Sequence, residues 1–218
     1  MLQSNQYELL DKLRFGKDND VRKEALQELI NLEHEAQFDE TDILKLLDDK
    51  DPVIQVYAIG AVGRKQMTSG IPELRKRYLE SSNPLILNEL LTAFNHYESD
   101  DFLDTVLEKL RKLNKKPLFF LKRWARSEDT SEKGYILDQI LIPSLKYIQQ
   151  IGNPGVEKSV KPFLEHEDAN VRWHMLKLFD SLEIALKPDV LQKMVDSDTS
   201  PLVREQAAIV LTKQSSTN

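Results

Sequence analysis

The chain has 218 residues, of which 40% are hydrophobic and 30% charged, a composition typical of folded proteins. Its 36 acidic residues outnumber its 30 basic ones, and the resulting net charge of -6 disfavours general adhesion to nucleic acid or anionic lipid. The sequence contains no cysteine, which excludes disulfides, thiolate metal sites and a cysteine nucleophile.

Neither the N-terminal segment nor the most apolar stretch has the pattern of a targeting or membrane sequence. Residues 1–20 lack a basic segment followed by a long apolar run, so no signal peptide is predicted. The most apolar stretch, residues 135–151, is interrupted by Asp138, Pro143 and Lys146, so it does not predict a membrane span. We therefore expect a cytoplasmic protein without membrane association.

Amphipathic stretches recur along the chain, and each precedes a turn. They are YELLDKLRF (7–15), TDILKLLDD (41–49), IPELRKRYLE (71–80), FLDTVLEKLRKL (102–113), VEKSVKPFLEH (156–166) and KPDVLQKMVDS (187–197). We predict that each forms the first helix of a helix pair. Asp, Ser and Pro in the turns that follow are residues that cap and begin a second helix.

An apolar residue marks the start of each predicted second helix. These residues are Val21, Ile54, Ile86, Phe119, Val171 and Val203. Most lie about 32 residues apart, a period that suits two helices and two short turns. The longer interval before Val171 predicts an irregular central repeat at about residues 127–155. Further apolar residues four and eight positions after the markers share one helical face.

The turns resemble those of the HEAT-repeat family, in particular the short bacterial form also seen in phycobilisome-lyase-type repeats. The matching segments are NDVR (19–22), DPVIQ (51–55), NPLIL (83–87), ANVR (169–172) and SPLVR (200–204). The resemblance implies an all-α, right-handed α-solenoid of about seven antiparallel helix pairs, forming one domain over residues 1–218. An aspartate six residues before the turn arginine is typical of the family. Asp198 keeps that spacing to Arg204, and Asp49 keeps it to Gln55.

The resemblance also places the second helices on the concave side of the stack. Candidate partner-binding residues on that surface are Tyr57, Asn88, Lys122, Trp173 and Lys177. Exposed aromatic residues commonly anchor interfaces, so Tyr57 and Trp173 are the predicted apolar anchors. The alternative is that both rings pack against a neighbouring repeat.

One segment departs from the acidic average of the chain. Residues 109–126 contain eight cations and no acid: Lys109, Arg111, Lys112, Lys115, Lys116, Lys122, Arg123 and Arg126. We expect Lys122, Arg123 and Arg126 to steer an acidic partner segment toward the surface. The alternative is a solvated face of two helices, paired with nearby acids.

Catalytic and metal-binding motifs are not found. The sequence has no Gly-rich phosphate loop, no His-Glu-x-x-His pair and no Gly-x-Ser-x-Gly turn. The tightest set of possible metal ligands is His166, Asp168 and His174, which would need a fourth ligand. We predict no metal and no cofactor.

These observations predict a non-enzymatic scaffold or adaptor that binds a protein partner, with nucleic acid disfavoured by the net charge. Two alternatives rest on likeness of fold alone. One is a bilin-lyase-type subunit. The other is a protein similar to the helical-repeat DNA glycosylases, which use a cationic groove with tryptophans and an aspartate. That mixture is loosely similar to Trp124, Arg126, Asp129 and Trp173 of this chain. The last helix, residues 201–213, is apolar on one face, so either a monomer or an end-on dimer is expected.

Overall fold

The computed structural model describes residues 2–31, 40–97, 100–115 and 140–216. All secondary structure in these ranges is helical, which confirms the predicted all-α class. In the same ranges, no helix combines the length and the apolar character needed to cross a membrane. The predicted candidates Lys122, Arg123 and Arg126 lie outside the described residues.

The chain divides into two compact units, residues 1–99 and residues 100–218. Each unit is described by itself. The single domain over residues 1–218 therefore stays a prediction. So does the irregular repeat at about 127–155, of which only residues from 140 onward are described.

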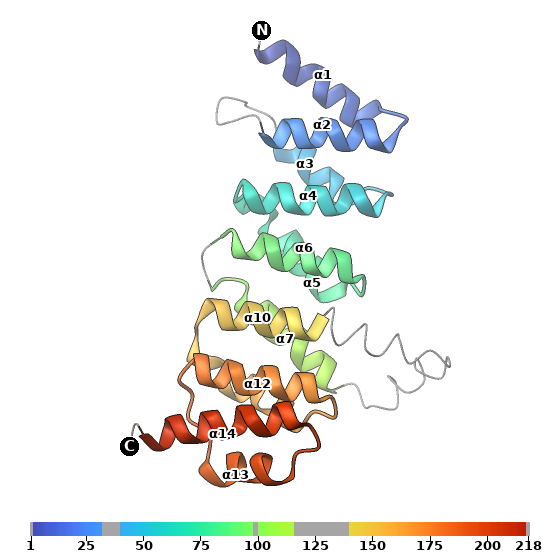
Figure 1. The fold of residues 1–218 in the computed structure, drawn as a ribbon. Coiled ribbons are helices and arrows are strands. Elements are labelled where there is room, and N and C mark those ends of the chain that lie inside the picture. The colour runs from blue at the N-terminus through green and yellow to red at the C-terminus, as the bar shows by residue number, and fades with distance from the viewer. Residues whose placement is uncertain (1, 32–39, 98–99, 116–139, 217–218) are drawn as a thin grey trace, which may run out of the picture. The chain divides into compact units, whose positions relative to one another are not determined.

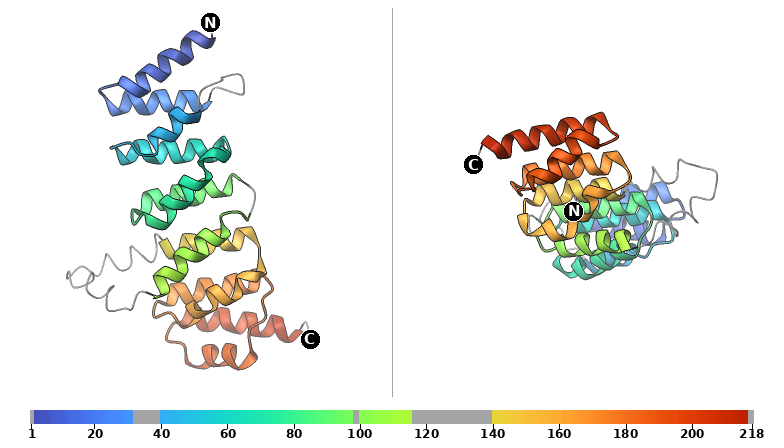
Figure 2. Two further views of the ribbon diagram at one scale, coloured as in Figure 1. Left: turned by 180° about the vertical axis from the view of Figure 1, so that it is seen from behind. Right: turned by 90° about the horizontal axis from the view of Figure 1, so that it is seen from below.

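The first unit places its helices in two layers. Its elements are α1 (Leu2–Phe15), α2 (Asn19–Asn31), α3 (Glu40–Leu46), α4 (Pro52–Arg64), η1 (Thr68–Gly70), α5 (Ile71–Glu80) and α6 (Pro84–Asn95). Helices α2, α4 and α6 lie side by side in one layer, and α3 and α5 lie behind them (Figures 1 and 2). α4 is in contact with both α2 and α6, and α1 packs on α2.

The second unit has the same kind of layering. Its elements are α7 (Leu103–Lys115), α10 (Ile142–Ile151), η3 (Pro154–Val156), α11 (Glu157–Val160), η4 (Lys161–Glu165), α12 (Ala169–Ser181), α13 (Pro188–Ser197) and α14 (Pro201–Ser216). α12 packs between α10 and α14, while α7, α11 and α13 form the other layer (Figures 1 and 2). α10 ends at Gly152, which adopts the left-handed conformation that favours glycine at a helix C-terminus.

The predicted first helix over residues 156–166 is not one continuous α-helix. The chain forms η3, α11 and η4 there. Pro162 lies within this segment and lacks the backbone N–H that a continuing α-helix requires, which accounts for the division. The other predicted first helices are observed with shifts of a few residues at their ends.

Side-chain caps begin α4, α6 and α12, and in α4 and α12 the capping residue is an aspartate, as predicted. The side chains of Asp51 and Asn83 accept hydrogen bonds from the backbone N–H groups of Val53 and Leu85, at 2.8 and 3.0 Å. Asp168 does the same for Asn170 in the second unit, at 2.8 Å. A proline in the first turn of α4 and of α6 adds a fixed backbone angle suited to the start of a helix.

The core follows the predicted helical register. The markers Ile54, Val171 and Val203 are completely buried, whereas Ile86 is half-buried and Val21, in the first turn of α2, is 40% exposed. The positions four residues later are also buried in both units: Ala25, Ala58, Leu90, Met175 and Ala207. This spacing directs one face of each second helix into the core.

Gly63 lets α4 and α6 approach each other closely. A Cβ atom at this position would lie 2.6 Å from both the Cα and the Cβ of Ala93.

Gly63→Ala in an unobstructed helix would raise stability by about 1 kcal/mol, because alanine has the higher helix propensity. Here we expect a decrease of about 1–3 kcal/mol, because the methyl group overpacks the helix contact. Urea unfolding of the variant measures the sign. An increase in stability would contradict this close approach.

Candidate functional site

A buried arginine–aspartate pair links α12 to the turn before α14. Arg172 donates from Nε and Nη2 to the two carboxylate oxygens of Asp198, at 2.8 and 2.7 Å. Its Nη1 donates to the backbone carbonyls of His166 and Glu167, at 2.7 and 2.9 Å. Both side chains of the ion pair are about nine-tenths buried. Arg172 therefore ties its own turn to the next one.

The first unit contains an equivalent pair. Arg22 of α2 binds Asp49, which precedes α4, through both terminal nitrogens. Its Nε donates to the carbonyl of Leu13 at 3.0 Å, so this guanidinium also reaches the end of the preceding helix. The carboxylate of Asp49 additionally accepts the backbone N–H of Asp51 at 2.9 Å, as Asp198 accepts that of Ser200.

The spacing of six residues between Asp198 and Arg204 places the arginine side chain against the backbone of the aspartate. Arg204 donates to the backbone carbonyl of Asp198 at 2.6 Å, and Gln55 does the same for Asp49 at 2.6 Å. The carboxylate instead receives the arginine of the preceding turn, 26 or 27 residues earlier in the chain. Sequence reasoning noted these aspartates but did not pair them with Arg22 and Arg172, although the recurring interval is visible in the sequence.

Both aspartates are held in the ionised form. The hydrogen bond from Arg172 is the main cause that lowers the pKa of Asp198, and the Ser200 N–H adds to it. For Asp49, burial by itself raises the pKa, but the Arg22 hydrogen bond and the Asp51 N–H together lower it below its ordinary value. The pKa values of both aspartates are lowered, and the nitrogens of both arginines already donate to protein acceptors. These are the properties of ion pairs that orient the turns. They do not describe groups poised to exchange protons.

The predicted residues of the first unit lie on α4 and α6. Tyr57 and Asn88 are half-buried, and Nζ of Lys23 lies 5.7 Å from the centre of the Tyr57 ring. The half-buried Glu89, which sequence reasoning missed, lies over Gly60 of α4. A Cβ atom there would be 2.3 Å from its carboxylate oxygen. Burial raises the pKa of Glu89, although Arg64 and His96 act in the opposite direction.

In the second unit the structure brings Trp173 and Lys177 together on α12. Trp173 is half-buried, and Lys177 is exposed with its Nζ 4.5 Å from the centre of the Trp173 ring. The ring of His174 meets Trp173 edge-on, with 4.8 Å between ring centres. These contacts of the Trp173 ring are thus with residues of its own helix, and the side chain is neither fully exposed nor fully buried.

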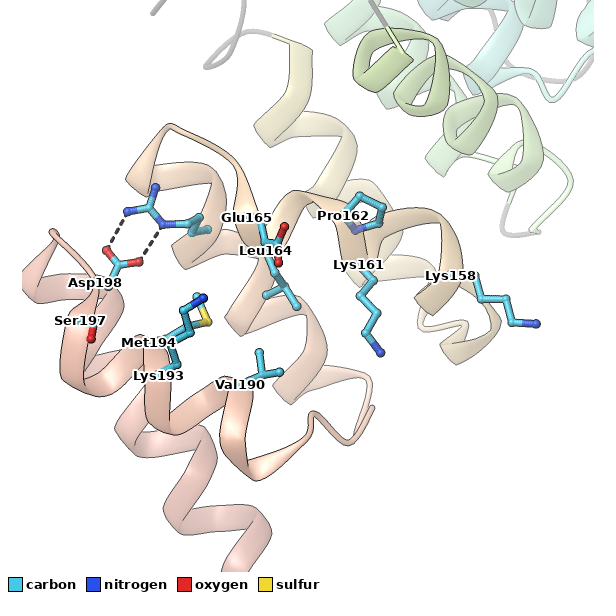
Figure 3. A pocket seen from close by; sticks show the side chains of 11 residues that line it. Lys158, Lys161, Pro162, Leu164, Glu165, Val190, Lys193, Met194, Ser197 and Asp198 are labelled. Atoms are coloured by element: carbon cyan, nitrogen blue, oxygen red, sulfur yellow. Dashed lines mark hydrogen bonds and ion pairs between the residues drawn. The ribbon is translucent and has the colours of Figure 1, made fainter. Parts of the chain in front are cut away.

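A hollow of about 770 Å³ lies between the α11–η4 segment and α13 (Figure 3). Its lining residues are Lys158, Lys161, Pro162, Leu164, Glu165, Arg172, Val190, Lys193, Met194, Ser197 and Asp198. This hollow belongs mainly to the layer of first helices, whereas the predicted binding residues lie on the second helices. Lys158 and Lys161 come from one segment and Lys193 from another, so the sequence alone does not show that these lysines line one hollow.

The histidine set considered for metal binding has other contacts. Nδ1 of His166 accepts the backbone N–H of Asp168 at 3.1 Å, and the ring of His174 meets that of Trp173 edge-on. Across the described ranges, no group of three or more histidine, aspartate or glutamate side chains is arranged to hold a metal ion.

Comparison with known proteins identifies no family. No protein-family model matches the chain, and no curated protein matches it significantly. A solved structure described as an engineered protein, from the Northeast Structural Genomics Consortium, aligns over 98% of this chain and 97% of its own. The sequence identity is 17% and the TM-score is 0.45, so this likeness carries no argument about fold or function.

Replacing Asp198 by asparagine tests the role of the buried pair. Asp198→Asn leaves the Arg172 guanidinium without its counter-charge, and we expect the free energy of unfolding at neutral pH to fall by roughly 3 kcal/mol. The folded-state pKa of Asp198 lies below its ordinary value of about 3.9. The contribution of its charge is therefore fully present above that value and is lost as the pH falls through the folded pKa. Urea unfolding from neutral pH down to about pH 3 should show a constant stability gap that begins to narrow only below about pH 4.

Asp196→Asn is the matched control. Asp196 is exposed on α13 and accepts a hydrogen bond from Gln192 at 2.9 Å. We expect its replacement to change stability by less than about 0.5 kcal/mol. Equal stability of the two variants would show that the Arg172–Asp198 pair does not hold the turns together.

Proposed function

We propose that this protein is a non-enzymatic scaffold or adaptor of the HEAT-repeat type, which binds a protein partner through the concave surface formed by its second helices. The proposal includes a right-handed α-solenoid of about seven helix pairs and a cytoplasmic location. The support for the repeat type is local. Capped turns with the same hydrogen-bond pattern recur in both units, and a buried arginine–aspartate pair joins two turns in each unit.

The observation that carries the binding proposal is the arrangement of Trp173. Its indole is accessible in part, while Lys177 stacks on its face and His174 meets it edge-on. These neighbours restrict the ring, so little side-chain entropy is lost when a partner covers it. Tryptophan in such a setting is the residue type most enriched among those that dominate binding energy.

The basic segment remains part of the proposal. The described members of this run, Lys109, Arg111, Lys112 and Lys115, lie on α7. Lys109 is buried, and Lys112 forms an ion pair with Glu108 at 2.7 Å. The residues expected to steer an acidic partner, Lys122, Arg123 and Arg126, lie outside the described residues. The glycosylase-like alternative depends on Trp124, Arg126 and Asp129, which also lie outside them.

Substitution of Trp173 tests the proposed anchor. A partner is first captured from native lysate with the parent protein and identified, and its affinity is then measured with purified proteins. We expect Trp173→Ala to weaken binding by about 30-fold, the loss typical of a central tryptophan anchor. Gln192→Ala, an exposed substitution on α13, is the control and should leave the affinity unchanged. An unchanged affinity for Trp173→Ala would overturn the assignment of this surface.

Tryptophan fluorescence measures the exposure of Trp173 in the free protein, before a partner has been identified. The chain has two tryptophans, so Trp124→Phe leaves Trp173 as the reporter. We expect emission that acrylamide quenches, because the ring is only half-buried, and a shift toward the blue when the partner binds. Emission that is blue and resistant to the quencher in the free protein would mean that Trp173 belongs to the core.

A further inference from the structure

We infer that the hollow between η4 and α13 is a second binding site, which takes an extended protein segment carrying an acidic residue beside an apolar one. This site goes beyond the proposed second-helix surface, because the other layer of the unit forms most of it. In Figure 3, Lys161 and Lys193 extend from facing walls into the space between η4 and α13. The two walls are therefore positioned to contact one segment at the same time.

The base of the hollow is apolar. Leu164 and Met194 are at least nine-tenths buried, and Val190 is half-buried beside them. An apolar side chain inserted between the walls would remove further surface of Val190 and Met194 from water. Met194 has a flexible thioether side chain, which adapts to ligands of different shape.

The rim is positively charged. Four cations line the hollow against two carboxylates, Glu165 and Asp198, within a chain of net charge -6. The charge of Asp198 is already balanced by its pair with Arg172. Lys161 forms an exposed ion pair in which its Nζ lies 2.8 Å from Oε1 of Glu157. A negatively charged ligand is thus the charge-complementary one.

The spacing of the cations favours carboxylates distributed along a peptide over one compact phosphate group, and the net charge of -6 disfavours a nucleic-acid backbone. Arg172 cannot hold a ligand anion in a bidentate contact, because it already directs all three of its nitrogens to protein acceptors. The remaining cations at the hollow are the lysines, which act as separate point charges. They suit carboxylates that are spaced along a peptide chain. A hollow of about 770 Å³ has room for a few residues of such a segment.

The test uses the full chain and two fluorescent peptides. One peptide alternates glutamate and leucine, and the other has glutamine in place of each glutamate. Lys161→Glu combined with Lys193→Glu reverses the two facing charges. Lys146→Glu combined with Lys187→Glu makes the same change in net charge at exposed positions of the second unit that do not line the hollow. All four lysines are exposed, so these variants should fold, which circular dichroism checks.

Fluorescence anisotropy should show binding of the acidic peptide to the parent protein and at least about tenfold weaker binding to the Lys161/Lys193 variant. The Lys146/Lys187 variant should bind within about twofold of the parent, and the glutamine peptide should not bind. Equal weakening in both lysine variants, or no binding of the acidic peptide to the parent protein, would overturn the proposal. So would binding of laurate, a carboxylate with an apolar tail, in competition with and more tightly than the peptide.

Methyl NMR locates the peptide without any substitution of lysine. With the methionine methyl groups labelled, the signal of Met194 should move on addition of the acidic peptide, while those of the buried Met67 and Met175 should stay in place. A peptide that leaves Met194 unmoved binds elsewhere and contradicts the site. Trp173→Ala should retain the peptide affinity, which separates failure at this hollow from failure of the second-helix surface.

Discussion

The buried pair between an arginine of one second helix and the aspartate before the next is the contact on which the arrangement of successive turns depends. Apolar packing of α10, α12 and α14 can hold helices together at many angles and offsets, because it is not directional. Arg172 makes a bidentate contact with Asp198 and donates hydrogen bonds to two backbone carbonyls. These directional contacts allow far fewer angles and offsets between the helices. A buried ion pair often adds little net stability over an apolar substitute, so its main contribution here is to fix geometry.

The features that sequence reasoning predicted correctly are those governed by local chemistry. The caps at Asp51 and Asp168 depend on a side chain and a backbone N–H two residues away, and both are present. The buried face of each second helix follows from a repeat of four residues, as Ala58 and Met175 illustrate. The prediction of one helix over residues 156–166 was wrong, although Pro162, which interrupts that helix, stands in the sequence.

The features that sequence reasoning missed depend on contacts between distant residues. Asp198 was noted only for its spacing to Arg204, because a spacing of six is a local signal, whereas its carboxylate binds Arg172. The hollow was missed for a related reason. Lys161 and Lys193 come from two different elements and face each other only after folding. Glu89 was passed over because its setting depends on the absence of a side chain at Gly60 in another helix.

The double use of each aspartate has a consequence for how the protein opens. The carboxylate of Asp198 binds the guanidinium that anchors α12 and also accepts the backbone N–H of Ser200 at the start of α14. Helices of this length are marginal on their own in water. If the turn before α14 opens, Arg172 loses its counter-charge, so α12 is weakened at the same moment. The two helices therefore share one opening event instead of fraying separately, and a short polar contact extends the cooperative unit across consecutive turns.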